Sequence, residues 1–234
     1  MKTKICGLKD LESTLTAIQC GADFIGFVFF PQSKRNITPG KAADICSKIG
    51  HRARRVGVFV DEEPERVNAI ARLCDLDYVQ LHGSEDAAYI EKMRCPVIKA
   101  FGYRPNTFSS KEINKIPAQL ILVDTWRHGF SGGSGMQFSW RRAAEEIKKI
   151  KASVIIAGGL NVSNLQKAWD VFHPFGVDVS SSLEVDGKKD PEKIRAFLEA
   201  VHTLKYHREN EYVIPAEEKE PGQKPRRKHR KVEE

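Results

Sequence analysis

Cys6 and Asp124 are the residues of this chain whose types and positions best suit acid–base chemistry. Each ends a short apolar stretch, "TKIC" at residues 3–6 and "LILVD" at residues 120–124. A carboxyl group can donate a proton to a reacting atom, and a thiolate can remove one. Asp124 could equally cap a helix or anchor a loop, and Cys6 could be a small core residue. The elements that carry the two residues decide between these interpretations.

Eight short segments rich in β-branched and apolar residues recur along the chain at near-even intervals. Each has the length and the composition of a strand. They are residues 3–7, 22–29, 54–60, 78–83, 96–101, 120–125, 153–159 and 176–181. Between them apolar residues recur with helical spacing, as at Ala42, Ile45, Cys46 and Ile49. The chain therefore reads as strands that alternate with helices.

Eight strands alternating with eight helices in about 200 residues predict an α/β fold, a single (β/α)8 TIM barrel. A doubly wound open sheet is the alternative, but its phosphate-binding patterns GxGxxG and GxxxxGK[ST] are missing from the sequence. We expect residues 1–204 to form the barrel. Residues 205–234 are charged and nearly free of apolar side chains, so we expect a disordered tail there.

Active sites of barrel enzymes lie at the carboxyl ends of the strands, and the turns after strands seven and eight often bind phosphate. In a closed ring these two strands lie between strand six and strand one, so Asp124 and Cys6 would flank the phosphate site. Small residues in the two turns let backbone N–H groups approach an anion, although tight turns alone would also require them. The turn residues are Gly158, Gly159, Ser180 and Ser181.

Two loops at the same end carry further candidates. Arg35 lies in "FFPQSKRNITP" at residues 29–39, where a guanidinium could grip a carboxylate through two hydrogen bonds. A solvated surface arginine is the alternative. Residues 127–138 hold four glycines, at positions 129, 132, 133 and 135, which is typical of a mobile lid or of a plain flexible connection.

Composition limits the remaining classes. The 234 residues include five scattered cysteines without a CxxC pair or a zinc spacing, which favours a reduced, cytoplasmic protein. No apolar run is long enough to cross a bilayer and the first residues do not resemble a signal peptide, so we expect no membrane association. The net charge of +7 owes much to "KPRRKHRK" at residues 224–231. This run could contact phosphates without sequence preference, but it lacks the interleaved aromatic residues of a base-stacking surface.

As a set, these residues resemble phosphoribosylanthranilate isomerase of tryptophan biosynthesis. The resemblance covers residues 3 to about 203, in order. The matching pieces are "KICG", "GADFIGFVF", "PQSKR", "VGVFV", "VQLHG", "PVIKA", "LVDT", "GGSG", "IIAGGL" and "GVDVSS", followed by Glu184.

The resemblance implies an Amadori rearrangement of N-(5-phosphoribosyl)anthranilate to 1-(2-carboxyphenylamino)-1-deoxyribulose 5-phosphate. It matches the general base to Cys6, the general acid to Asp124 and the carboxylate-holding arginine to Arg35. It also matches Asp178 to a substrate-contacting aspartate, and the turns named above to the phosphate site. Acid–base chemistry of this kind implies no metal and no organic cofactor. The expected partner is a phosphorylated sugar–anthranilate, and we expect a monomer or a homodimer.

The chain departs from the family at several positions. Ser182 stands where the family usually has glycine, and its side chain could crowd the phosphate turn. Met136 and Ser139 stand where lysine and aspartate are usual in the lid. One alternative is the sibling isomerase of histidine biosynthesis, or a dual-substrate enzyme, but that family has aspartate at the position of Cys6. The other is a non-catalytic barrel whose basic tail binds nucleic acid, which we favour less.

Overall fold

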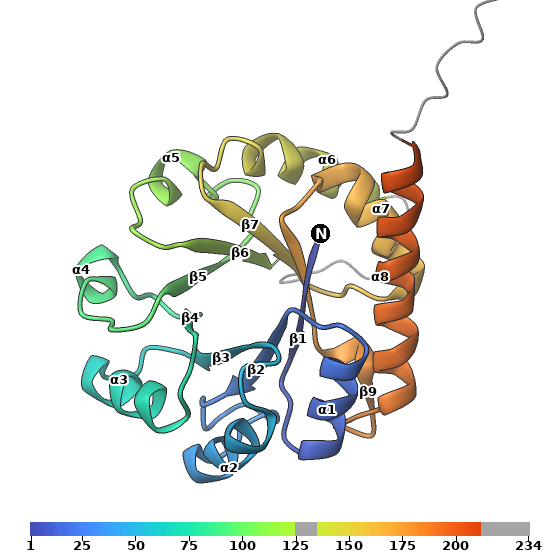
Figure 1. The fold of residues 1–234 in the computed structure, drawn as a ribbon. Coiled ribbons are helices and arrows are strands. Elements are labelled where there is room, and N and C mark those ends of the chain that lie inside the picture. Colours follow the sequence, from blue (N-terminus) through green and yellow to red (C-terminus); the bar gives the residue numbers. More distant parts are fainter. Residues whose placement is uncertain (125–134, 212–234) are drawn as a thin grey trace, which may run out of the picture.

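The structure, a computed structural model, describes residues 1–124 and 135–211. Eight parallel strands close into a barrel in chain order, and helices surround it (Figure 1). The expected (β/α)8 barrel is therefore confirmed. The strands are β1 (Lys2–Cys6), β2 (Phe24–Val28), β3 (Arg54–Phe59), β4 (Tyr78–Leu81), β5 (Val97–Gly102), β6 (Leu120–Asp124), β7 (Ser153–Ala157) and β8 (Gly176–Val179).

The helices follow the strands one by one. They are α1 (Leu11–Gln19), α2 (Pro39–Ile49), α3 (Pro64–Leu73), α4 (Ala87–Ile90), α5 (Ser110–Ile113), α6 (Gly135–Ile147), α7 (Val162–Phe172) and α8 (Pro191–Glu211). Their first turns are fixed locally: Asp10 caps α1, and Thr38 caps α2 just before Pro39. A 3-10 turn, η1 (Ser181–Leu183), and a small antiparallel pair, β9 (Glu184–Val185) and β10 (Lys188–Lys189), lie between β8 and α8.

The ring closes where β1 pairs with β8, with Lys4 opposite Asp178 and Ile5 opposite Val179. An apolar cluster fills the barrel interior, and a larger one joins the outer face of the sheet to the helices. Strands covered on both faces are apolar along their whole length, which is why β2 is buried throughout. Closure brings the first and the last strand together, so their carboxyl ends share one rim.

The end of the chain and the loop after β6 differ from the rest of the barrel in how far the structure describes them. Helix α8 continues past Leu204, where the sequence predicted the domain boundary, to Glu211. Residues 212–234 lie outside the described residues, so the predicted disorder of the tail stays a prediction. Residues 127–134 of the predicted lid also lie outside them, and Gly135 begins α6. Within the described ranges no helix combines the length and the apolar character needed to span a membrane.

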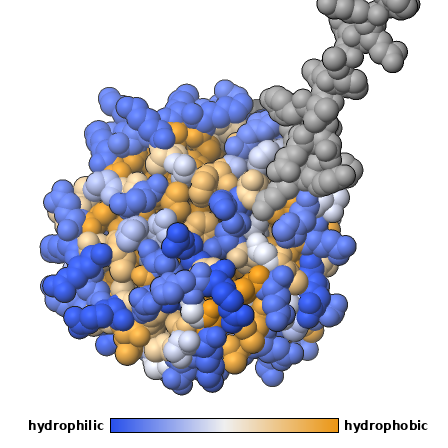
Figure 2. Space-filling view, viewed as in Figure 1, coloured by the Kyte–Doolittle hydropathy of each residue, from blue (hydrophilic) through white to orange (hydrophobic). Residues whose placement is uncertain are grey.

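The drawn surface is largely hydrophilic, with apolar atoms gathered in patches between the polar side chains (Figure 2). Large exposed apolar side chains are few and separate among the described residues. They are Leu73, Val162, Phe175 and Val185. Isolated apolar side chains of this kind are normal on a protein surface and indicate no binding site.

A buried ion pair joins β5 to the loop after β4. Glu85 accepts hydrogen bonds from Lys99 Nζ at 2.8 Å and from the backbone N–H groups of Asp61 and Gly83, each at 2.9 Å. The side chains of Glu85 and Lys99 are 1% and 3% exposed, so solvent screens this pair little. Replacing one partner of a buried pair leaves an uncompensated charge, which makes the pair a strong determinant of stability.

We therefore expect Glu85→Gln to lower the free energy of unfolding by about 3–5 kcal/mol, because Lys99 would lose its counter-charge. Urea unfolding followed by circular dichroism measures the change. Glu91→Gln, on the exposed end of α4, is the matched control and should change stability by less than about 0.5 kcal/mol. Equal stability of the two variants would contradict the assignment.

Candidate functional site

The carboxyl ends of the strands surround a cavity of about 610 Å³. Every candidate site residue from the sequence lines it: Cys6, Arg35, Asp124, Gly158, Gly159, Asp178, Ser180 and Ser181. Asp124 ends β6, and Cys6 ends β1, and the ladders place β7 and β8 between them. The two candidate acid–base groups therefore approach the cavity from opposite sides of the β7 and β8 turns, as expected from the strand order.

The turn after β7 brings two glycines to the cavity. Gly158 and Gly159 have φ angles of 99° and 65°, in the region that side chains disfavour. Asn161 caps α7, and its side chain accepts hydrogen bonds from the N–H groups of Ser163 and Asn164. The first turn of α7 is thus satisfied by its own cap, and the glycines are the part of this turn that faces the cavity.

The turn after β8 is tied to both neighbouring strands. Ser180 Oγ donates a hydrogen bond to the carbonyl of Cys6 at 2.9 Å, and Ser182 Oγ donates one to the carbonyl of Leu160 at 2.5 Å. The Ser182 hydroxyl is directed at the β7–α7 turn, and Ser182 is not among the lining residues. The side chain that could have crowded the anion site links its two turns instead.

Arg35 is held by an ion pair. Its Nε and Nη2 donate to the two carboxylate oxygens of Glu184, at 2.6 and 2.8 Å. Lys189 Nζ donates to the same carboxylate at 2.6 Å and to the carbonyl of Ser180 at 3.0 Å. The alternative of a solvated surface arginine is wrong, because this half-buried guanidinium is paired and lines the cavity. Both hydrogen bonds to Glu184 come from Nε and Nη2, and none comes from Nη1.

The cavity has an apolar side next to Arg35. Val28, Val58 and Phe30 pack with Cys6 in a separate cluster at the ends of β1, β2 and β3. The glycine and serine turns of β7 and β8 line the same cavity. The cavity therefore offers apolar side chains, a guanidinium and small-residue turns to a ligand that carries an aromatic carboxylate and a phosphate.

The five cysteines are all free, and Cys6 alone among them lines the cavity. Burial raises the pKa of Cys46 to about 12 and that of Cys74 to about 11, which keeps both thiols protonated. Burial also raises the pKa of Cys6, but there the Lys4 ammonium opposes it. Cys46 and Cys74 belong to the apolar core, as the helical spacing predicted.

Sequence reasoning missed Lys4, Gln80 and Lys189. Lys4 is 0% exposed and donates from Nζ to Asp178 Oδ1 at 2.9 Å. Gln80 lines the cavity beside His82 and has a buried side-chain oxygen without a hydrogen-bond partner in the described structure. For Lys4 the sequence did hold a signal, the alternation of side chains along a strand. Lys4 and Cys6 are two residues apart on one strand and therefore face the same side of the sheet.

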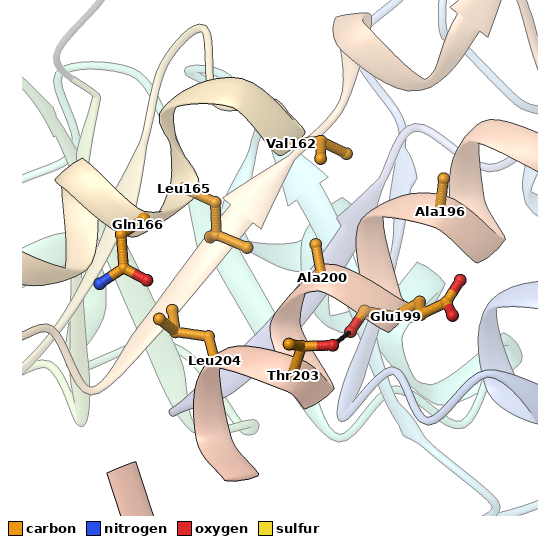
Figure 3. Close-up of a pocket in the computed structure, with 8 residues that line it drawn as sticks. All are labelled: Val162, Leu165, Gln166, Ala196, Glu199, Ala200, Thr203 and Leu204. Atoms are coloured by element: carbon orange, nitrogen blue, oxygen red, sulfur yellow. Dashed lines mark hydrogen bonds between the residues drawn. The ribbon is translucent and has the colours of Figure 1, made fainter. Parts of the chain in front are cut away.

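A second hollow, of about 410 Å³, lies on the outer surface between α7 and α8. Leu165, Ala200 and Leu204 gather between the two helices, with Gln166 and Glu199 to either side (Figure 3). Glu199 is the one titratable residue in its lining, so this hollow lacks a pair of groups for acid–base chemistry. No cluster of three or more potential metal ligands occurs in the described ranges.

Comparison with known proteins agrees with the geometry. The family described as N-(5'phosphoribosyl)anthranilate (PRA) isomerase matches residues 3–200. An N-(5'-phosphoribosyl)anthranilate isomerase of Bacillus cereus (strain AH187) is 42% identical over 198 residues, which cover 85% of this chain and 96% of the relative.

Solved structures give the same result. The phosphoribosyl anthranilate isomerase of Thermotoga maritima has a TM-score of 0.75 and 38% identity, and the match covers 87% of this chain and 99% of that one. A structure of a phosphoribosyl anthranilate isomerase in complex with reduced 1-(o-carboxyphenylamino)-1-deoxyribulose 5-phosphate has a TM-score of 0.73 and 35% identity, with the same coverage. From its matched length, its barrel and its similarity to these enzymes, the chain belongs to the family of N-(5'-phosphoribosyl)anthranilate isomerases.

Proposed function

We propose that Asp124 and Cys6 are the general acid and the general base with which this chain performs its family's reaction. That reaction is the Amadori rearrangement of N-(5-phosphoribosyl)anthranilate to 1-(2-carboxyphenylamino)-1-deoxyribulose 5-phosphate in tryptophan biosynthesis. The observation that carries the assignment is the placement of an acid and a thiol on either side of the β7 and β8 turns, in one cavity. The acid donates a proton and the base removes one, so both roles are proton transfers.

The first step falls to Asp124. Its carboxyl group protonates the ribose ring oxygen, the C1–O bond breaks, and the anthranilate nitrogen supplies electrons to form a protonated Schiff base. The Cys6 thiolate then removes the proton from C2, and the electrons of that C–H bond form an enolamine. Protonation at C1 and loss of the hydroxyl proton from C2 complete the ketone. Every proton that is taken up is returned, so the sum of the steps is an isomerisation.

The two ends of the substrate fit different sides of the cavity. The phosphate lies at the turns of Gly158–Gly159 and Ser180–Ser181, whose backbone N–H groups suit an anion. The aromatic ring packs against Val28, Phe30 and Val58. The carboxylate approaches Arg35, where Glu184 occupies Nε and Nη2 and leaves Nη1 for the substrate. We assign Asp178 to the floor of the site beside Cys6.

One assay tests the proposal directly. The purified full chain should consume phosphoribosylanthranilate without added metal or cofactor, followed by the loss of the substrate's fluorescence. An absence of turnover would contradict it. Turnover of the aminoimidazole substrate of histidine biosynthesis would favour the dual-substrate alternative, which the thiol at position 6 disfavours.

The remaining expectations about the chain follow from this function. We propose that it acts in the cytoplasm as a monomer or a homodimer and that neither a membrane nor nucleic acid is its partner. A variant that ends at Glu211 should keep full turnover, because every lining residue of the cavity precedes that position. Loss of turnover on this truncation would instead favour a role for the basic run at residues 224–231.

Ser182 provides a test of the phosphate site. We expect Ser182→Ala to raise KM a few-fold with little change in kcat, because the hydrogen bond between the two phosphate turns is lost and such bonds contribute about 0.5–1.5 kcal/mol. Steady-state kinetics measures both constants. Ser163→Ala, an exposed serine on α7 outside the cavity, is the control. A lower KM in Ser182→Ala would mean that the side chain crowds the phosphate after all.

A further inference from the structure

Lys4 lies two residues before Cys6 on β1, with its side chain buried in the barrel interior. Residues two apart on a strand point to the same face, so the ammonium group and the thiol share the inner side of the sheet. The register of β1 and β8 places Lys4 opposite Asp178, and Lys4 Nζ donates to Asp178 Oδ1 at 2.9 Å. A buried ion pair of two adjacent strands thus fixes the lysine directly below Cys6.

Gly26 on β2 shows that the ammonium and the thiol are close to each other. A Cβ atom at position 26 would lie 3.0 Å from Cys6 Sγ and 3.1 Å from Lys4 Nζ. Cys6 Sγ and Lys4 Nζ therefore both lie close to Gly26 of β2, the residue that the strand register pairs with Cys6. A side chain at position 26 would have to displace one of them, because contacts this short are rare for a real Cβ atom.

The charges around the sulfur come from several strands and from the loop after β2. Lys4 on β1, Asp178 on β8 and Lys189 on β10 act on the thiol directly. Arg35 and Glu184 join this group through the ion pairs of Glu184. His82 and Asp124 face Asp178 from the ends of β4 and β6. Besides His82, the basic members of this group are Lys4, Lys189 and Arg35, and its acidic members are Asp178, Glu184 and Asp124.

The titration of these groups agrees with this arrangement. Burial raises the pKa of Cys6, and the Asp178 charge adds to that rise; the Lys4 charge is the largest influence that lowers it, followed by the hydrogen bond of Lys4 and the charge of Lys189. Burial alone would lower the pKa of Lys4, but Asp178 and Cys6 raise it above its ordinary value, so the lysine keeps its proton. The ammonium is therefore present whenever the thiol loses its proton.

We propose that Lys4 is a positioning residue that, held by Asp178, fixes the Cys6 sulfur against β2 and stabilises its thiolate form for the reaction proposed above. When the thiolate forms, the proton of the thiol goes to solvent, and Lys4 retains all of its own. When the thiolate takes the C2 proton, the ammonium remains beside a neutral thiol. The role rests on the proposed function, but the state of the sulfur can be measured without substrate.

The test is the alkylation of Cys6 by iodoacetamide as a function of pH, followed by mass spectrometry of the peptide that contains Cys6. We expect Lys4→Met to slow alkylation at pH 8 by about tenfold, because a rise of one pKa unit lowers the thiolate fraction tenfold. The acidic limb of kcat/KM should move to higher pH by the same amount, while KM changes little.

The control is Lys99→Met, because Lys99 is the equally buried lysine of β5 and is paired with Glu85. It tests whether the loss of any buried lysine slows alkylation. Gly26→Ala is the second variant, since it keeps Lys4 and Cys6 but requires Lys4 Nζ and Cys6 Sγ to move by a few tenths of an ångström. It should shift alkylation in the same direction even where Lys4→Met folds poorly.

An unchanged pH dependence of Cys6 alkylation in folded Lys4→Met would overturn the proposal. An equal slowing in Lys99→Met would overturn it as well, because the effect would then not depend on a charge beside Cys6. The proposal is supported if the pH dependence of Cys6 alkylation shifts in Lys4→Met and in Gly26→Ala but not in Lys99→Met. If that shift is seen in a protein that fails to consume phosphoribosylanthranilate, the role of Lys4 stands and the proposed function falls.

Discussion

Cys6→Ala should fold normally and lose about 10²–10⁴-fold of its turnover, because the base that removes the C2 proton would be missing. The side chain is small and lies at the cavity wall, so its removal disturbs little of the apolar core. Steady-state kinetics and urea unfolding measure the two effects separately. Binding of reduced 1-(o-carboxyphenylamino)-1-deoxyribulose 5-phosphate, the compound bound in a related isomerase, should persist in the variant.

The matched control is Cys20→Ala, which removes a half-buried thiol at the end of α1, outside the cavity. It should keep its turnover. Full activity in Cys6→Ala, with stability unchanged, would end the assignment of the base. A loss of both activity and ligand binding would place Cys6 in binding rather than in proton transfer.

The pH dependence of the wild-type protein follows from the same group. Burial raises the pKa of Cys6 above its ordinary value of 9.0, and the base acts as the thiolate. The thiolate fraction therefore increases with pH until the pKa is passed, and kcat/KM should rise through neutral pH. A kcat/KM that falls with pH between 6 and about 8.5 would contradict a thiolate base.

Asp124→Asn is the second change for which we expect a loss of about 10²–10⁴-fold in turnover. An amide has the shape of the carboxyl group but cannot donate its proton to the ribose ring oxygen in the way that an acid can. The carboxylate ends β6 opposite Ala157 of β7, so the substitution alters no ladder contact. Ligand binding should again persist, since the proposed phosphate and carboxylate contacts lie elsewhere in the cavity.

Asp170→Asn, an exposed substitution on α7, controls for the loss of one negative charge. A single-turnover experiment adds a sharper readout, because Asp124→Asn should block the opening of the ring whereas Cys6→Ala should allow it. Accumulation of a ring-opened species in Asp124→Asn would reverse the two roles. Unchanged turnover would remove Asp124 from the mechanism.

The count and spacing of apolar segments sufficed to predict the barrel, and with it the rim on which Cys6 and Asp124 lie. Barrel closure is set by strand number, which is visible in a sequence. The supporting contacts were out of reach because they join distant residues. Lys4 and Asp178 are 174 positions apart, and Arg35 and Glu184 are 149 apart. Nothing in the local pattern of either residue points to its partner.

Ser182 shows a second kind of limit. A serine in place of a glycine indicated crowding of the phosphate turn, because the sequence does not say in which direction a side chain points. The structure directs its hydroxyl to Leu160, so the same residue acts as a link. The same limit applies to Arg35. An arginine at this position indicated a group that binds a carboxylate, but its ion pair with Glu184 depends on the fold of the β8–α8 connection.

The pairing of β1 with β8 has a consequence for how the protein is made. Lys4 and Cys6 are among the first residues to leave the ribosome, whereas Asp178 is synthesised after three quarters of the chain. An unfinished chain that ends before Gly176 therefore carries a lysine without its carboxylate and a thiol without its final surroundings. The surroundings of the proposed base are complete only when the last strand has been added. Nascent and prematurely terminated chains are therefore expected to be inactive.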